Sequence, residues 1–169
     1  MTQDPHSPPG DPIDIHDSIA YRIHRLARLL RKHFLHMGTA EGLELTPEQW
    51  FCLNKLRTGG AMSQVSLTDD IFADRPNITR ILGRLEKRGL VSRQPDPDDA
   101  RRRLVALTPQ GLELHDRFAA VASRARGELF GSITPQDMAV AMGVLGMLET
   151  SLTQAGQTQA HAPNKDHTT

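Results

Sequence analysis

The stretch ITRILGRLEKRGLVSRQPDPDDARRRLVALTPQG, residues 78–111, contains the pattern that decides the fold. Its first part places Ile78, Ile81, Leu82 and Leu85 three and four positions apart, the spacing of one buried face of a helix. Gly89 follows two basic residues, as is typical of the C-terminal end of a helix. The segments LVSRQ and RRLVAL, joined by PDPDDA, then predict a β-hairpin. The stretch therefore predicts a short amphipathic helix followed by a hairpin.

The segments around this stretch predict further helices, several of which begin with threonine followed by proline. Threonine at the N-cap accepts a hydrogen bond from a backbone amide, and proline at the first helical position loses none. Gln49, three residues after Thr46, completes the pattern of a capping box. The threonine–proline pairs are Thr46-Pro47, Thr108-Pro109 and Thr134-Pro135.

The order of the expected elements predicts a mainly α-helical protein built around a winged helix-turn-helix. Residues 15–37 have one apolar stripe and are expected to form a long amphipathic helix that ends before Gly38. The helix from Pro47 is expected to end at Gly59, and Ser63 can cap a short helix before the one in the opening stretch. Two short helices with a tight turn, followed by a short two-stranded β wing, make that fold.

The charges of the chain balance overall but are unevenly distributed. The 169 residues include 20 basic and 20 acidic side chains, whereas residues 75–103 include nine basic and four acidic ones. Such a surplus indicates a surface that faces a polyanion, with a solvated charged face as the alternative. Cys52 is the only cysteine, and no apolar run reaches the roughly 20 residues of a membrane helix. We therefore expect a cytoplasmic protein without membrane association.

The sequence offers little for catalysis. It has no phosphate-binding glycine loop, no nucleophile elbow and no pair of catalytic carboxylates in a recognisable setting. No cofactor is expected. We therefore expect a binding protein and not an enzyme.

The residues opposite the apolar stripe of the opening helix are candidates for contacts with double-stranded DNA. The N-terminal half of a recognition helix meets base edges in the major groove. Arg80 can pair with guanine and Asn77 with adenine, each contributing about 1–3 kcal/mol of discrimination. Arg84 and the start of the preceding helix are expected to contact phosphates. The candidates on these two helices are Ser63, Gln64, Arg75, Asn77, Thr79, Arg80 and Arg84.

The segment MSQVSLTDDIFADRPNITRILGRLEKRGLVSRQPDPDDARRRLVALTPQG, residues 62–111, strongly resembles the winged-helix core of MarR-family transcriptional regulators. The resemblance rests on ITRILGRLEKRGLVSR and on the wing segment Asp99-Ala100-Arg101, which occur in register without a gap. It implies an obligate homodimer, in which residues 15–37 and 109–152 interlock with the same helices of a second copy.

The expected domain organisation follows from the resemblance and from the composition of the ends. Residues 1–13 and 153–169 are polar and lack apolar periodicity, so both are expected to be disordered. The MarR-like domain is expected to span residues 14–152, with its winged core at 46–108.

The resemblance also implies roles for residues of the wing. Arg101 matches the wing-tip arginine that enters the minor groove, where a narrow groove concentrates negative potential. Asp99 matches the partner that orients this arginine through a charge-assisted contact. Arg102 and Arg103 alternate along the predicted strand, so at most one is expected to face a phosphate, and Arg102 is the one included among the DNA contacts.

Two positions depart from an ideal pattern. The turn between the short helices usually has glycine in this family where the chain has Phe72, because a left-handed backbone favours a residue without Cβ. Gly83 lies in the middle of the expected recognition helix, at a cost of about 1 kcal/mol relative to alanine. Close approach to the DNA backbone is one candidate reason for it.

The commonest mechanism of the family implies a repressor that responds to a ligand. A small aromatic or phenolic anion binds between the dimerisation helices and the winged lobe and shifts the dimer between two geometries. The dimer thereby releases a pseudo-palindromic operator with half-sites about 10 bp apart. His24 and Arg28 on the first helix and Trp50 on the second are candidates for that crevice, and the alternative for each is a surface charge or a core aromatic.

Three other functions stay open at this point. Zinc sensing would use His33 and His36, with Glu41 and His115 nearby, but these residues lack the spacing of a ligand cluster. Redox sensing would use Cys52, for which a buried structural role is the simpler interpretation. The third is a winged helix that binds protein instead of DNA, although such modules usually lack a basic recognition helix and an arginine-tipped wing.

Overall fold

The computed structural model describes residues 15, 18–71, 75–99 and 101–160. The arm at 1–13 and the departure at Phe72 lie outside the described residues. The chain divides into two compact units, one ending at Ala125 and one beginning at Arg126. Among the described helices, none is both long and apolar enough to cross a membrane.

Six helices and three strands make up the described part of the chain. The helices are α1 (Ile19–Ala40), α2 (Pro47–Gly59), α3 (Gln64–Ile71), α4 (Arg75–Lys87), α5 (Pro109–Phe130) and α6 (Pro135–Ala160). The strands are β1 (Met62–Ser63), β2 (Val91–Pro95) and β3 (Arg103–Leu107).

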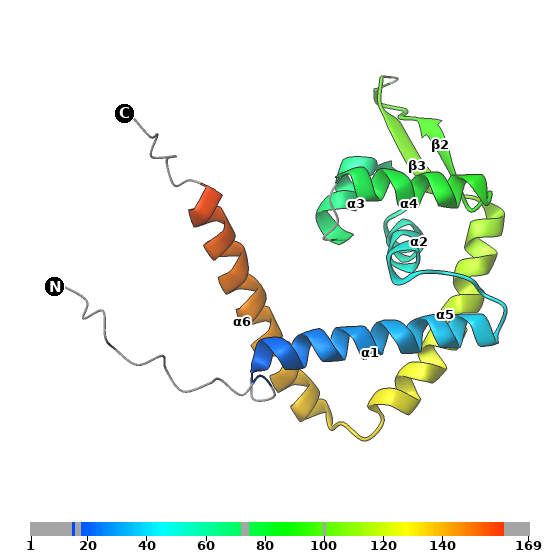
Figure 1. Ribbon diagram of the computed structural model, residues 1–169. Helices are drawn as coiled ribbons and strands as arrows, with labels where there is room; N and C mark the ends of the chain where they lie inside the picture. The colour runs from blue at the N-terminus through cyan, green and yellow to red at the C-terminus, as the bar shows by residue number, and fades with distance from the viewer. Residues whose placement is uncertain (1–14, 16–17, 72–74, 100, 161–169) are drawn as a thin grey trace, which may run out of the picture. The chain divides into compact units, whose positions relative to one another are not determined.

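The predicted fold class, a mainly helical winged helix-turn-helix, is confirmed. Strands β2 and β3 pair antiparallel, and their hairpin projects from the group formed by α2, α3 and α4 (Figure 1). The predicted two-stranded sheet has a third strand, because β1 pairs with the other edge of β3 to give the order β1-β3-β2. A strand of two residues has no alternation by which its sequence can indicate it.

Helix α1 differs at both ends from the predicted span of 15–37. It begins at Ile19 and continues through Gly38, which is buried and has a packing role. A Cβ at Gly38 would lie 2.6 Å from the carbonyl oxygen of Leu43. The helix ends instead before Gly42, whose φ is +67°, where the amides of Gly42 and Leu43 donate back to the last turn.

The last helix is longer than predicted. Residues 153–160, which belong to the segment expected to be disordered, form the final turns of α6. The hydroxyl of Thr153 donates to the carbonyl of Glu149 at 2.8 Å, and the alanines and glutamines that follow suit a helix. A polar composition is compatible with an exposed helix as well as with disorder, so composition alone misplaced the boundary. Residues 161–169 lie outside the described part.

The predicted caps at Thr46 and Gly89 are confirmed. The Thr46 hydroxyl accepts the Gln49 amide at 3.3 Å, and the Gln49 side chain accepts the Thr46 amide at 3.0 Å, which completes the capping box. Gly89 has a φ of +69°. Its amide donates to the carbonyl of Glu86 at 2.9 Å, and the amide of Leu90 donates to the carbonyl of Leu85 at 3.0 Å. These bonds end α4 in a Schellman motif.

The core of the winged lobe forms where α2, α3 and α4 meet the sheet and α5. Phe118 of α5 is fully buried. The centroid of its ring lies 4.9 Å from that of Phe34 on α1 and 4.8 Å from that of Trp50 on α2. Each large apolar side chain removed from water contributes about 1.5–3 kcal/mol. The largest fully buried side chains are Leu53, Leu67, Ile78, Leu82, Leu85, Leu90, Val105 and Phe118.

Helix α4, the hairpin and α5 meet at one packed junction. The hydroxyl of Thr108 donates to the carbonyl of Gly89 at 2.6 Å, and the amide of Thr108 donates to the carbonyl of Leu90 at 3.1 Å. The same hydroxyl oxygen accepts the amide of Gly111 at 3.0 Å and so caps α5. A Cβ at Gly111 would overlap the Leu90 carbonyl. Glycine therefore allows the first turn of α5 to contact the backbone that joins α4 to β2.

We expect Gly111→Ala to destabilise the lobe by about 1–3 kcal/mol, the usual cost of overpacking, because Leu90 cannot shift without displacing α4 and β2. Thermal unfolding followed by circular dichroism will show a lower midpoint. Gly83→Ala on α4 is the control, since its Cβ would meet no atom within 4 Å and alanine favours the helix. A midpoint for Gly111→Ala at or above that of the wild type would contradict the packed junction.

Candidate nucleic-acid interface

The outward face of α4 carries most of the predicted contact residues. Thr79, Arg80 and Arg84 are exposed and Asn77 is half-buried, while the apolar stripe on the other face is buried as predicted. Arg80 and Arg84 form no ion pair with any acidic side chain that the structure describes. Arg75 begins the helix, but its side chain lies outside the described part. The face thus presents cations available to an external anion.

The start of α3 is fastened to this face. The side-chain amide of Gln64 donates to the hydroxyl of Thr79 at 2.7 Å. This hydrogen bond fixes the position of α4 against α3. The hydroxyl of Ser63 accepts the amide of Ser66 at 3.1 Å, so Ser63 caps α3 as predicted. Ser63, at the end of β1, therefore lies next to Gln64 of α3, which contacts Thr79 of α4.

The tip of the hairpin is a closed turn held by aspartates. The amide of Asp96 donates to the carbonyl of Arg102 at 3.1 Å, and the amide of Arg102 donates to the carbonyl of Asp99 at 2.8 Å. The Asp96 carboxylate accepts the amide of Asp98 at 3.0 Å. These bonds give the tip a defined conformation, from which Arg101 and Arg102 extend into solvent.

Asp99 contacts Arg101 through a different atom from the one expected. Its carboxylate accepts the backbone amide of Arg101 at 3.0 Å, and its side-chain ion pair is with Arg102, at 3.4 Å. The reason is local, because an aspartate in a tight turn reaches the amide two residues on more easily than that residue's side chain. Asp99 therefore orients the backbone of Arg101 and leaves its guanidinium exposed.

A groove of about 500 Å³ lies between the start of α3 and the tip end of the hairpin. It is lined by Ser63, Gln64, Val65, Arg102 and Arg103. Both arginines line this groove, while the expectation that at most one of Arg102 and Arg103 faces a phosphate stays a prediction. Strand β3 begins at Arg103, so Arg102 belongs to the turn and does not follow the alternation of the strand. Arg103 thus lines the same groove as Ser63 and Gln64, although the predicted set of DNA contacts does not include it.

Other arginines of the cationic segment serve the fold. Arg93 on β2 pairs with Glu86 of α4 at 3.4 Å. Arg88 donates to the carbonyl of Glu44 at 2.7 Å, which links the end of α4 to the segment before α2. The surplus of positive charge is therefore concentrated on α4 and the wing tip.

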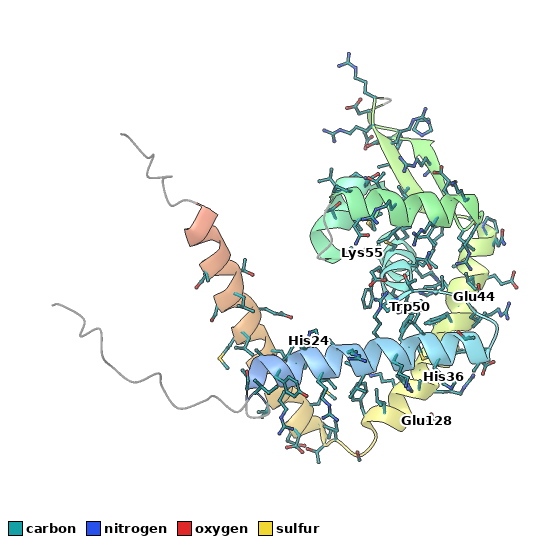
Figure 2. The ribbon with its side chains drawn as sticks, in the orientation of Figure 1. His24, His36, Glu44, Trp50, Lys55 and Glu128 are labelled. Carbon is teal, nitrogen blue, oxygen red and sulfur yellow. The ribbon has the colours of Figure 1, made fainter. Side chains whose placement is uncertain are left out.

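The three predicted effector residues lie in different surroundings. Trp50 stacks on His115 of α5, with ring centroids 4.8 Å apart and planes at 11°, and also touches Phe118. His24 and Arg28 are exposed on α1, and His24 lies toward the N-terminal end of that helix, away from Trp50 (Figure 2). Phe34 on α1 and Trp50 on α2 both contact Phe118. His24 lies ten residues before Phe34, which corresponds to about 15 Å along the axis of α1.

His115 is a buried link between α2 and α5 that its position in the sequence did not indicate. Its Nε2 lies 3.2 Å from the side-chain oxygen of Asn54, and its Nδ1 lies 2.9 Å from the carboxylate of Asp116. Asp116 also meets Arg57 of α2 at 3.4 Å. The hydrogen bond from His115, followed by that from Arg57, lowers the pKa of Asp116.

The surroundings of the histidines and of Cys52 do not favour zinc sensing or redox sensing. Among the described residues, no group of three or more histidine, cysteine, aspartate or glutamate side chains is placed to hold a metal ion. Cys52 is fully buried, and burial, with a smaller effect of the Glu48 carboxylate, raises the pKa of its thiol to about 12. A thiol of that pKa is almost entirely protonated at neutral pH and therefore a poor nucleophile.

Comparison with known proteins agrees with this geometry. The sequence model of the MarR family matches residues 45–102. A probable transcriptional regulator from Pseudomonas aeruginosa is 30% identical, with a TM-score of 0.68 over 79% of this chain and 98% of its own.

Two further structures share the fold at lower identity. The PcaV transcriptional regulator from Streptomyces coelicolor, in complex with its natural ligand, is 23% identical, with a TM-score of 0.74 over 83% of this chain and 98% of its own. A mutant MarR from E. coli, complexed with operator DNA, is 24% identical, with a TM-score of 0.70 over 77% of this chain and 92% of its own.

We expect the Cys52 thiol to resist a thiol reagent such as dithiobis-nitrobenzoate in the native protein at pH 8, because burial keeps it protonated. The absorbance of the released thiolate measures the reaction. The same protein in denaturant is the control and should release one equivalent rapidly. Full reaction of the native protein within the mixing time would contradict the buried assignment and favour a redox role.

Proposed function

Since the chain belongs to the MarR family of transcriptional regulators, we propose that it is a homodimeric repressor that binds a pseudo-palindromic operator. A small aromatic or phenolic anion releases it from the DNA. The observation that carries the proposal is the placement of the exposed cations of α4 and of the wing on either side of the start of α3. An interface of this kind suits a duplex, which presents a groove with phosphates on both sides.

In the proposed complex α4 lies in the major groove. Arg80 and Asn77 read bases, and Thr79, held by Gln64, positions the helix. The exposed Arg101 enters the adjacent minor groove from the wing tip, with its backbone held by Asp99. The phosphates between the two grooves are contacted by Ser63, Gln64, Arg75, Arg84 and Arg102. We also include Arg103 in the proposal, because it lines the same groove as Gln64 and Arg102.

Dimerisation is supported by apolar surface that one chain leaves open. Exposed aliphatic residues occur along α1, and a helix that is exposed over several turns is marginal in water without a partner. Helix α6 has a second exposed apolar set. The large apolar residues with at least 37% exposure are Ile19, Ile23, Leu26, Leu29, Leu30 and Leu35 on α1, and Val140, Met142, Val144, Leu145, Met147 and Leu152 on α6. The proposed domain is therefore residues 14–152, with 15–37 and 109–152 as its dimerisation helices.

The proposed effector site is the crevice between α1 and the winged lobe. Trp50 offers an aromatic wall whose position is fixed by His115 and Phe118. In the proposal the exposed His24 and Arg28 of α1 complete the site only in the ligand-bound dimer, where Arg28 offers positive charge for an anion. PcaV has been solved with its natural ligand, which supports effector binding as a property of this fold. Binding there would change the spacing of the two winged lobes and so lower the population that fits the operator.

We expect Arg101→Ala to weaken binding to an operator duplex at least tenfold, and Arg80→Ala to weaken it and also relax base preference at one position, because a bidentate contact contributes about 1–3 kcal/mol of discrimination. Fluorescence anisotropy on a duplex selected from a random library measures both. Arg93→Ala is the matched control, an exposed arginine paired with Glu86. Wild-type affinity in both test variants would remove the assignment, and a wild type that binds no DNA at low salt would favour a protein-binding module.

We expect the protein to sediment as a dimer and Leu26→Glu to sediment as a monomer, because Leu26 is 55% exposed on α1 and a buried carboxylate there would be unpaired. Analytical ultracentrifugation measures the mass. Val65→Glu, with 52% exposure on α3, is the control and should stay dimeric. A monomeric wild type at micromolar concentration would overturn the dimer.

A further inference from the structure

Gly83 lies in the middle of α4, and the described part of the protein gives no reason for a glycine there. A Cβ added to Gly83 would meet no atom within 4 Å. Its φ is not positive, so the backbone does not need a residue without a side chain. Glycine in a helix interior is nonetheless destabilising relative to alanine. Gly83 therefore lowers the stability of α4, and no contact within the described part of the protein compensates for this loss.

Other glycines of the winged lobe differ from Gly83 in this respect. A Cβ at Gly38 or Gly111 would overlap the backbone of Leu43 or Leu90. Gly89 has a positive φ that ends α4. Each of these glycines is explained by the fold, which makes the unexplained one at the centre of α4 informative.

The position of Gly83 on the helix indicates what lies outside it. Residues three and four apart share a face of a helix, so Gly83 lies directly beyond Arg80 and Thr79 and before Lys87. Thr79, Arg80 and Lys87 are all exposed. At Gly83 this polar face has no side chain, and the main chain itself forms the surface.

We propose that Gly83 is the point at which the sugar–phosphate backbone of DNA packs directly against the main chain of α4. The inference rests on the proposed DNA-binding function and adds a steric determinant to it. A deoxyribose at the edge of the major groove approaches a helix more closely where no Cβ intervenes. This approach sets the depth of α4 in the groove, and therefore whether Arg80 and Asn77 reach the base edges. Gly83 is a positioning residue and contacts no base.

The proposal separates selective from non-selective binding. Non-selective binding depends mainly on the number of phosphates neutralised by lysine and arginine, which a methyl group does not change. Selective binding also needs base contacts at a fixed depth. A side chain at residue 83 should therefore weaken binding to the operator and leave binding to random-sequence DNA nearly unchanged.

The test compares Gly83→Ala and Gly83→Leu with the wild type, in thermal unfolding and in anisotropy titrations on selected and on random duplexes. We expect Gly83→Ala to raise the unfolding midpoint by about 2–4 °C. Its affinity for the selected duplex should fall about tenfold, with less than a twofold change on random DNA, and Gly83→Leu should bind the selected duplex still more weakly. Thr58→Ala, at an exposed position of α2 outside the proposed DNA face and the proposed dimerisation helices, is the control and should change neither affinity.

Three results would overturn the proposal. Undiminished affinity of both Gly83 variants for the selected duplex would show that nothing packs closely at this position. A lower midpoint for Gly83→Ala would show that the glycine has a role inside the protein. A wild type without selective binding would refute the proposed function itself, and this result is recognised from the wild-type titration alone.

Discussion

The structure depends on the contact between the backbone at Gly89-Leu90 and the first turn of α5. The Thr108 hydroxyl donates to Gly89 and caps α5 at the same time, and only a glycine at 111 lets the two backbones touch. Because Leu90 is also where α4 ends and β2 begins, this contact sets three directions together: that of the recognition helix, that of the wing and that of α5. A change in any one of them is transmitted to the others through backbone and not through flexible side chains.

The placement of the acidic side chains explains how a chain with no net charge can present a cationic surface. The acidic side chains near it hold the interface in place, since Asp99 and Asp96 close the wing tip and Glu86 holds Arg93. The cations without such partners extend from α4 and from the tip, and the groove between them brings Arg102 and Arg103 to the start of α3. In the proposed complex the lobe meets the duplex at two grooves at once, and the buried link of His115 to Asn54 connects α2, on which the recognition helices pack, to α5.

The sequence alone predicts those features that depend on local chemistry. Thr46 and Gln49 indicate their capping box, Gly89 indicates the end of α4, and the spacing of Ile78 and Leu82 indicates the buried face, because each signal acts within one or two helical turns. Gly38 was misread because its role is to contact Leu43, which periodicity does not reveal. Strand β1, the His115 link and the shared groove of Arg102 and Arg103 depend on neighbours far apart in the chain, and the length of α6 depends on helix propensity in a segment whose composition resembles disorder. The proposed effector residues are the least predictable, because His24 and Arg28 on α1 are exposed whereas Trp50 stacks on His115, so the described part of one chain does not connect them.

Hydrogen–deuterium exchange of the wild-type protein, with and without a selected duplex, tests most directly the claim that one rigid lobe reads two grooves. The account predicts slower exchange in the same complex at the start of α3, through α4 and across the wing tip at residues 96–102, with saturation at the same DNA concentration. Protection of α4 without the wing tip, or protection confined to α1 and α6, would contradict it.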